Sequence, residues 1–260
     1  MATAIAAIYR YPVKGLSPER LQRVTLTPGK CLPEDRRFAL ALASTRFDPK
    51  QPEWLPKTHF AMLMRDERLA QLDTRFDSAT GELTIARDGT VALRASLGDP
   101  AGCRAIGDFV GDRLGDSVAR PLRVVAAPGH AFADARRKAN ASTDQYVSLI
   151  NLNSIAALAE TMGAPVEPLR FRANVYFERG VPAWEELAWI GREVLLGGAR
   201  LRVVSVITRC AATQVNPATA ARDLDIPAAL QRHFGHNLMG IYAEVAAGGE
   251  IAAGDALAIR

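Results

Sequence analysis

The chain has 260 residues, of which 48% are hydrophobic and 23% charged, and its formal net charge is +4 at pH 7. This composition is typical of a globular protein, and the length suffices for one large domain or two small ones. No apolar run approaches the roughly 20 residues of a membrane helix, and the N-terminus lacks the features of a signal peptide. No basic stripe interleaved with aromatic residues indicates nucleic-acid binding. We therefore expect a cytoplasmic protein that binds neither membranes nor nucleic acid.

The first hundred residues are predicted to form mainly short strands. Such β-prone runs, separated by proline and glycine, lie at residues 5–10, 24–26, 38–42, 83–85 and 91–93. Residues 60–72 carry apolar residues near helical spacing, which leaves helix and loop both open there.

The rest of the chain mixes strands with three predicted helices. The helices are expected at residues 107–115, with Asp108 as cap, after an N-cap at Asn153 or Ser154, and from Asp225 to Gly235. Further strands are predicted at residues 122–125, 171–177, 193–196, 201–207, 238–245 and 256–259. Residues 128–144 read as a long surface loop, whose basic run Arg136-Arg137-Lys138 is a solvated segment or an anion-binding loop.

Short strands, glycine-rich turns and few helices predict an α+β fold that is mainly β, either a β-barrel or a curved sheet, with peripheral helices. The dinucleotide, phosphate-loop and nucleophile-elbow motifs are absent. His233 and His236 are a weak metal pair without a third ligand nearby.

Cys210 follows the predicted strand at 201–207. A side chain at the end of a strand can project into a pocket, and a neighbouring guanidinium lowers a thiol pKa. Arg209 acts on the thiol directly only if the chain has already turned, because adjacent strand residues face opposite ways. The alternative is a small buried hydrophobe. Three widely spaced cysteines predict neither a disulfide framework nor a zinc site, and they fit a reducing compartment.

Several polar residues are candidates for binding an anion. Arg172 and Asn174 share one face of the predicted strand at 171–177, which suits an anionic ligand rich in hydrogen bonds. Lys14 and Arg36 precede or follow strands and could supply cations. For all four, surface charge or a solvated polar face is the competing interpretation. Asn151, Asn153 and Ser154 open a helix, where a phosphate site and an ordinary cap are both open.

Six short segments follow one another along the chain in an order that is typical of one protein family: Tyr11-Pro12-Val13-Lys14, Asp35-Arg36, Phe171-Arg172-Ala173-Asn174, Trp184-Glu185-Glu186-Leu187, the stretch from Arg209 to Pro217, and Gly254-Asp255. This order resembles the MOSC-domain proteins, relatives of the C-terminal domain of molybdenum cofactor sulfurase. Within this family, the chain is most similar in architecture to the two-part group that includes the mitochondrial amidoxime-reducing component. The resemblance implies an N-terminal β-barrel domain over residues 1–100 and a MOSC domain over residues 101–260.

The resemblance implies a molybdenum cofactor, molybdopterin, with Cys210 as the thiolate ligand of the metal and catalytic centre. Arg172 and Asn174 would contact the pterin, and Lys14 and Arg36 its phosphate and pterin. The implied cofactor-binding set is Lys14, Arg36, Asn151, Ser154, Arg172, Asn174, Thr208, Arg209 and Thr213. The chain departs from the family pattern in four places: Gly15 replaces a serine, Ala173 replaces a proline, residues 178–181 replace an acidic residue that some members carry, and residues 47–60 differ from the shorter hairpin of the reductase branch. The resemblance therefore implies the substrate less strongly than the cofactor.

The reaction implied is the reduction of N-hydroxylated or N- or S-oxygenated small molecules. No cluster of cysteines for an iron–sulfur centre is present in the sequence, so we expect electrons from a separate flavin or iron–sulfur protein. One alternative is a non-enzymatic carrier of cofactor or of sulfur, with a persulfide on Cys210. Another is a binding module in which the cysteine is structural.

Overall fold

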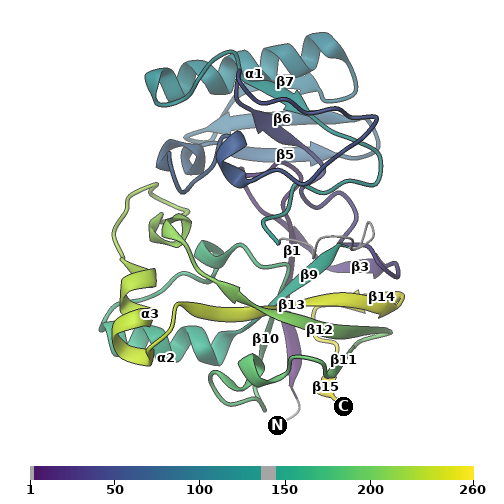
Figure 1. The fold of residues 1–260 in the computed structure, drawn as a ribbon, viewed down its shortest axis with the longest axis vertical. Helices are drawn as coiled ribbons and strands as arrows, with labels where there is room; N and C mark the ends of the chain where they lie inside the picture. Colours follow the sequence, from purple (N-terminus) through teal and green to yellow (C-terminus); the bar gives the residue numbers. More distant parts are fainter. Residues whose placement is uncertain (1–2, 136–144) are drawn as a thin grey trace.

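The computed structural model of the protein describes residues 3–135 and 145–260. Figure 1 shows a large curved sheet in the lower half, with α2 and α3 beside it, and a smaller assembly above it in which α1 lies over β5–β7. Strands outnumber helices throughout, which confirms the predicted mainly β, α+β class. None of the helices in the described ranges combines the length and hydropathy that crossing a membrane requires.

The large sheet contains eight strands. In spatial order they are β15 (Leu257–Ile259), β11 (Glu193–Leu196), β12 (Ala199–Thr208), β13 (Leu238–Ala247), β9 (Tyr146–Asn151), β10 (Val175–Glu178), β1 (Ala4–Arg10) and β2 (Glu19–Leu21). Neighbours are antiparallel except β9 and β10, which are parallel. A bridge between Ala4 and Ala256 brings β1 against the start of β15. The sheet therefore closes on itself as a barrel.

The interior of the barrel is apolar because side chains alternate along each strand. On β12, Leu201 and Val203 are buried while Arg202 is exposed, and Ile241 faces the same core from β13. On the outside, α2 (Leu152–Met162) and α3 (Ile226–Phe234) pack a second apolar cluster against the sheet. This rigid wall carries the end of β12, where Cys210 lies.

Three smaller sheets complete the fold. They pair β3 (Arg23–Leu26) with β14 (Gly249–Ala252), β4 (Ala39–Ala41) with β8 (Arg123–Val125), and β5 (Asp73–Asp77) with β6 (Glu82–Arg87) and β7 (Thr90–Ser96). Short 3₁₀ helices are η1 (Lys57–His59), η2 (Glu67–Gln71), η3 (Gly115–Ser117), η4 (Pro168–Phe171), η5 (Glu185–Ala188) and η6 (Ala211–Gln214). Strand pairing crosses the predicted division at residue 100, since β1 and β2 join the large sheet. The division itself stays a prediction.

Two helix starts differ from those predicted. α1 (Pro100–Leu114) begins well before residue 107, because Asp99 caps it by accepting hydrogen bonds from the next two backbone amides, at 2.9 and 2.8 Å. Asp followed by Pro at the first helical position is the stronger start signal. Asn151, rather than Asn153 or Ser154, caps α2 by accepting from the Asn153 amide at 3.0 Å.

The predicted strand at residues 171–177 is shorter than expected. Phe171 ends η4, Arg172 has a left-handed backbone with φ of 53°, and β10 starts only at Val175. Residues 60–72 contain the short η2 instead of an α-helix. Four strands, β2, β5, β9 and β14, have no counterpart among the predicted strands. β2 and β14 have only three and four residues, which is too short a pattern to recognise.

Candidate functional site

A cavity of about 850 Å³ lies beside Cys210, between the barrel and the smaller sheets. Both parts of the chain line it, and the basic groups facing it outnumber the acidic ones. Eight of the residues predicted for the site are among its lining: Lys14, Arg36, Arg172, Asn174, Thr208, Arg209, Cys210 and Thr213. Side chains from four separate stretches of sequence therefore meet at one place.

Cys210 lies where β12 ends and the chain turns into η6. Thr208 is the last strand residue, and the Arg209 amide donates to the Asn237 carbonyl at 2.8 Å. The Cys210 carbonyl accepts from the amide and the hydroxyl of Thr213, at 3.0 and 2.9 Å. Within the described ranges the half-buried thiol makes no hydrogen bond and no disulfide. It is thus held by its backbone and free at sulfur.

Arg209 points into the protein instead of toward the thiol. Its Nε and Nη2 donate to the Met239 carbonyl at 2.8 and 2.5 Å, and its Nη1 donates to the Phe171 carbonyl at 3.0 Å. Burial lowers the pKa of this guanidinium. All three guanidinium nitrogens donate to backbone carbonyl oxygens. Arg209 therefore holds the turn before Cys210 in place, which is a positioning role.

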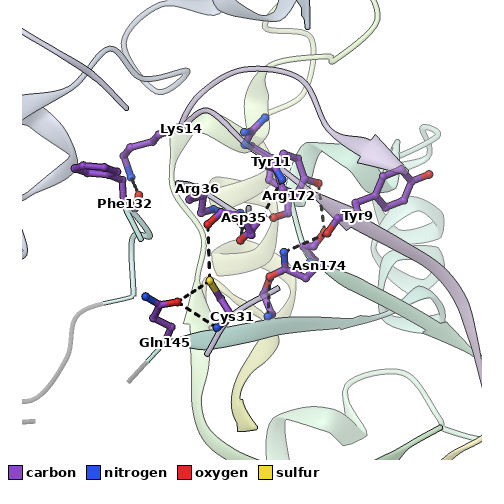
Figure 2. Close-up of polar contacts among 12 residues, drawn as sticks. Tyr9, Tyr11, Lys14, Cys31, Asp35, Arg36, Phe132, Gln145, Arg172 and Asn174 are labelled. Atoms are coloured by element: carbon purple, nitrogen blue, oxygen red, sulfur yellow. Dashed lines mark hydrogen bonds and ion pairs between the residues drawn. The ribbon is translucent and has the colours of Figure 1, made fainter. Parts of the chain in front are cut away.

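Two arginines face one aromatic ring at the basic end of the cavity (Figure 2). The guanidinium carbons of Arg36 and Arg172 lie 4.7 and 4.3 Å from the ring centroid of Tyr11, within cation–π range. Asp35 joins this arrangement: its carboxylate accepts from the Tyr11 amide at 2.8 Å and from Arg36 Nη1 at 2.5 Å. Burial raises the pKa of the Tyr11 phenol to about 12, so the ring stays neutral.

The charges of this arrangement are unbalanced. Asp35 neutralises Arg36, and Arg172 has no carboxylate partner among the described residues. Burial, reinforced by the charge of Arg36, lowers the pKa of Arg172 to about 10. A buried cation without a counter-ion is costly. The site therefore suits a bound anion.

Asn174 does not share a strand face with Arg172, because the chain is left-handed at Arg172. Its Oδ1 accepts from the amide and hydroxyl of Ser148, at 3.1 and 2.8 Å, and its Nδ2 donates to the Tyr9 carbonyl at 3.2 Å (Figure 2). The side chain borders the cavity, but its hydrogen bonds brace β9 against β1. Its main effect is to hold the strands beneath the arginine pair.

Lys14 reaches the same cavity from the loop after β1. Its Nζ donates to the Phe132 carbonyl at 2.8 Å (Figure 2) and forms an ion pair with Asp134. The second Asp134 oxygen lies 3.9 Å from the Nζ of Lys57. Burial lowers the pKa of Lys14, although Asp134 opposes the shift.

Asn151 and Ser154, which the sequence places in the cofactor-binding set, do not line the cavity. Both are fully buried beside Glu186: the Ser154 hydroxyl donates to its carboxylate at 2.8 and 2.9 Å, and Asn151 Nδ2 donates at 3.3 Å. Burial raises the pKa of Glu186. The side chains at the start of α2 therefore hydrogen-bond to this internal carboxylate.

Two further expectations can be placed. The basic run at 136–138 lies outside the described residues. In the described ranges, no group of three or more histidine, cysteine or acidic residues could hold a metal ion, His233 and His236 included.

Several residues that shape the cavity had no role predicted from sequence. In the sequence, Tyr11 and Asp35 stand out only as neighbours of Lys14 and Arg36, and no pattern indicates a role for Lys57, Asp134 or Tyr242, which also line the cavity. The Tyr-Pro and Asp-Arg pairs are the signals that could have indicated the first two. Asp134 meets Lys14 across 120 positions of sequence, a contact that no local pattern encodes.

Residues 132–258 match the family model of the MOSC domain. No curated protein matches the chain. The YuaD protein from Bacillus subtilis has 14% sequence identity and a TM-score of 0.46, over 100% of this chain and 96% of that chain. YiiM from Geobacillus stearothermophilus has 21% identity and a TM-score of 0.35, over 44% of this chain and 53% of that chain.

Proposed function

This chain is a MOSC-domain protein, and on that premise we propose that its cavity binds the molybdenum cofactor for the reduction of N-hydroxylated or N- or S-oxygenated small molecules. The family associates the chain with molybdenum cofactor chemistry. The reductase activity and the role of Cys210 are the proposal.

One observation carries the proposal: the Cys210 sulfur and the Arg172 guanidinium line the same cavity, and among residues 3–135 and 145–260 the first has no hydrogen bond and the second no carboxylate partner. Thiolates bind soft metal centres, so Cys210 would hold molybdenum. Guanidinium groups suit phosphate and polar heterocycle edges, so Arg36 and Arg172 would hold the phosphate and pterin, with Lys14 beside them. Arg209 and Thr213 would keep the sulfur in place through the backbone contacts described above.

The reaction is balanced by two electrons and two protons: R₂N–OH + 2 e⁻ + 2 H⁺ gives R₂NH and H₂O. When bound, the cofactor supplies two-electron chemistry at molybdenum. The electrons would come from a separate flavin or iron–sulfur protein. The protein's own contribution is to hold the cofactor by its charges, to fix the thiol, and to leave part of the cavity for substrate.

The experiment is to produce the protein in a host that makes the cofactor, then to measure pterin content and the reduction of benzamidoxime with an artificial electron donor. We expect bound pterin and conversion to benzamidine in the wild type, and loss of both in Arg172→Met. Arg232→Met, which changes an exposed arginine on α3, is the matched control. Wild-type protein that carries pterin but turns over no N-oxygenated compound contradicts the reductase assignment.

A carrier of sulfur is the second candidate, because the Cys210 thiol is half-buried and makes no hydrogen bond with any described residue. A persulfide could form there by transfer of a sulfane sulfur from a donor persulfide, in which R–S–SH and the Cys210 thiol give R–SH and the Cys210 persulfide, without breaking a contact to a described residue. Mass spectrometry that detects one extra, thiol-labile sulfur on Cys210, in protein that reduces no N-hydroxylated compound, would favour this function over the reductase.

A further inference from the structure

The basic end of the cavity already contains an anion, which belongs to the protein itself. The Asp134 carboxylate lies between two lysines: one oxygen pairs with Lys14 Nζ, and the other is 3.9 Å from Lys57 Nζ. Lys14 is only 8% exposed, and its ammonium group also donates to the Phe132 carbonyl. The lysine is therefore fixed, and its charge is directed at the position that Asp134 occupies.

The Asp134 side chain is more exposed and makes fewer contacts than that of Lys14. Its side chain is 49% exposed, and within the described ranges its oxygens bind only the two lysines. Burial alone would raise the pKa of this carboxyl group, but the charges of Lys14, Lys57 and Arg36, which all line the cavity, outweigh burial and lower it. The carboxylate is thus ionised near neutral pH, and it can turn into solvent without breaking a backbone contact.

The same charges are those that an external anion would use. Lys14, Arg36, Lys57, Arg172 and Asp134 all line the one cavity. An anion that pairs with Lys14 competes with the Asp134 carboxylate, because that carboxylate already neutralises the charge of the ammonium group and, with the Phe132 carbonyl, takes two of its three N–H donors. Exchanging one monovalent anion for another adds no charge attraction, whereas a divalent anion gains one unit of charge opposite the cations.

We propose that Asp134 is a resident counter-ion that anionic ligands must displace, and that it restricts this end of the cavity to anions carrying two or more charges. The inference deepens the proposed function, since the ligand anion there would be the cofactor's phosphate. It assigns Asp134 to anion selection and gives it no part in the chemistry at Cys210.

The test is calorimetric titration of the purified protein with sulfate, a divalent anion, and with nitrate, a monovalent one. We expect sulfate to bind the wild type weakly and nitrate not measurably. In Asp134→Asn, sulfate affinity should rise at least about tenfold, because one neighbouring charge shifts a pKa by about one unit, which is a tenfold change in an equilibrium constant. Nitrate binding should become measurable in this variant. Asp134→Glu keeps the carboxylate and should behave as the wild type.

Two controls locate the effect. Asp112→Asn removes an exposed acidic partner of Arg120, so it changes the net charge equally and should leave both affinities unchanged. Lys14→Met, added to Asp134→Asn, should abolish the gained binding. Equal sulfate affinity in Asp134→Asn and the wild type, or an equal gain in Asp112→Asn, overturns the inference.

The titration also separates this inference from the proposed function. If Asp134→Asn gains sulfate affinity while protein from a cofactor-competent host lacks pterin, Asp134 is still the counter-ion and the cofactor assignment fails. If the wild type contains pterin but Asp134→Asn gains no affinity for sulfate, the cofactor assignment stands and the role of Asp134 is wrong.

Discussion

Arg36 donates a hydrogen bond from its Nη2 to the carbonyl oxygen of Arg172 at 2.8 Å, and both side chains lie over the ring of Tyr11. The two arginines are 136 positions apart in sequence. Each has a left-handed backbone conformation, with φ of 51° for Arg36 and 53° for Arg172, which residues other than glycine rarely adopt. Such strain persists only where surrounding contacts fix it, and it gathers at functional sites.

The first prediction concerns the ring between these arginines. Tyr11→Leu removes the shared aromatic face and should lower the free energy of unfolding by about 2–4 kcal/mol. Tyr11→Phe keeps the ring and loses the hydroxyl, which contacts the Ala173 carbonyl at 3.3 Å and the Tyr176 hydroxyl, so its cost should be about 1 kcal/mol. Urea denaturation measures both. Equal losses in the two variants would contradict the cation–π role of the ring.

The second prediction concerns Arg209. Lysine has no fork with which to bind the Met239 and Phe171 carbonyls together, so Arg209→Lys leaves at least one buried acceptor unpaired. We expect a loss of about 2–4 kcal/mol in unfolding free energy. Arg232→Lys, at an exposed position on α3, should change it by less than about 0.5 kcal/mol. A loss in Arg209→Lys no larger than in this control would contradict the role of Arg209 in fixing the turn.

The third prediction follows from the raised pKa of Glu186. Burial favours its protonated form in the folded protein more than in the unfolded chain, so its contribution to stability is complete below the unfolded pKa of about 4.3. That contribution is lost as pH rises through the folded pKa. Glu186→Gln cannot lose a proton, so its stability relative to the wild type should improve from pH 4 to pH 7. Urea denaturation at several pH values measures this difference, and a constant difference would contradict it.

The fourth prediction tests the close packing behind Arg209. Gly240 has φ of 75°, and a Cβ there would lie 2.6 Å from the Leu149 carbonyl oxygen and 2.5 Å from Ile150 Cγ1. Gly240→Ala should therefore cost about 2–4 kcal/mol in stability. Gly89 has a similar φ of 74° and open space around it, so Gly89→Ala isolates the backbone cost of about 1–2 kcal/mol. Thermal and urea denaturation compare the two, and equal costs would rule out the clash.

Local signals in the sequence predicted part of this structure well. The end of α2 at Gly163 and the extent of α3 from its cap Asp225 to Gly235 follow from caps and apolar spacing, which act within one helix. The position of Cys210 just after a strand is of the same kind. The mainly β class follows from strand length and turn composition.

The remainder depends on contacts that no local pattern encodes. A helix cap and a phosphate-binding helix start have the same sequence signature, so the sequence does not reveal that the Ser154 hydroxyl donates to Glu186. The left-handed turn at Arg172 is set by its tertiary neighbours, because arginine has no local preference for positive φ. The pairing of Lys14 with Asp134 likewise depends on the closure of the whole fold.

The measurement that tests the central claim most directly is the molybdenum content per chain of protein made in a cofactor-competent host. We predict close to one molybdenum per wild-type chain and the same in Cys103→Ser, which alters a cysteine on α1 far from the cavity. In Cys210→Ser we predict loss of the metal, because a hydroxyl is a poor ligand for a soft site. Equal molybdenum content in Cys210→Ser and the wild type would contradict the account.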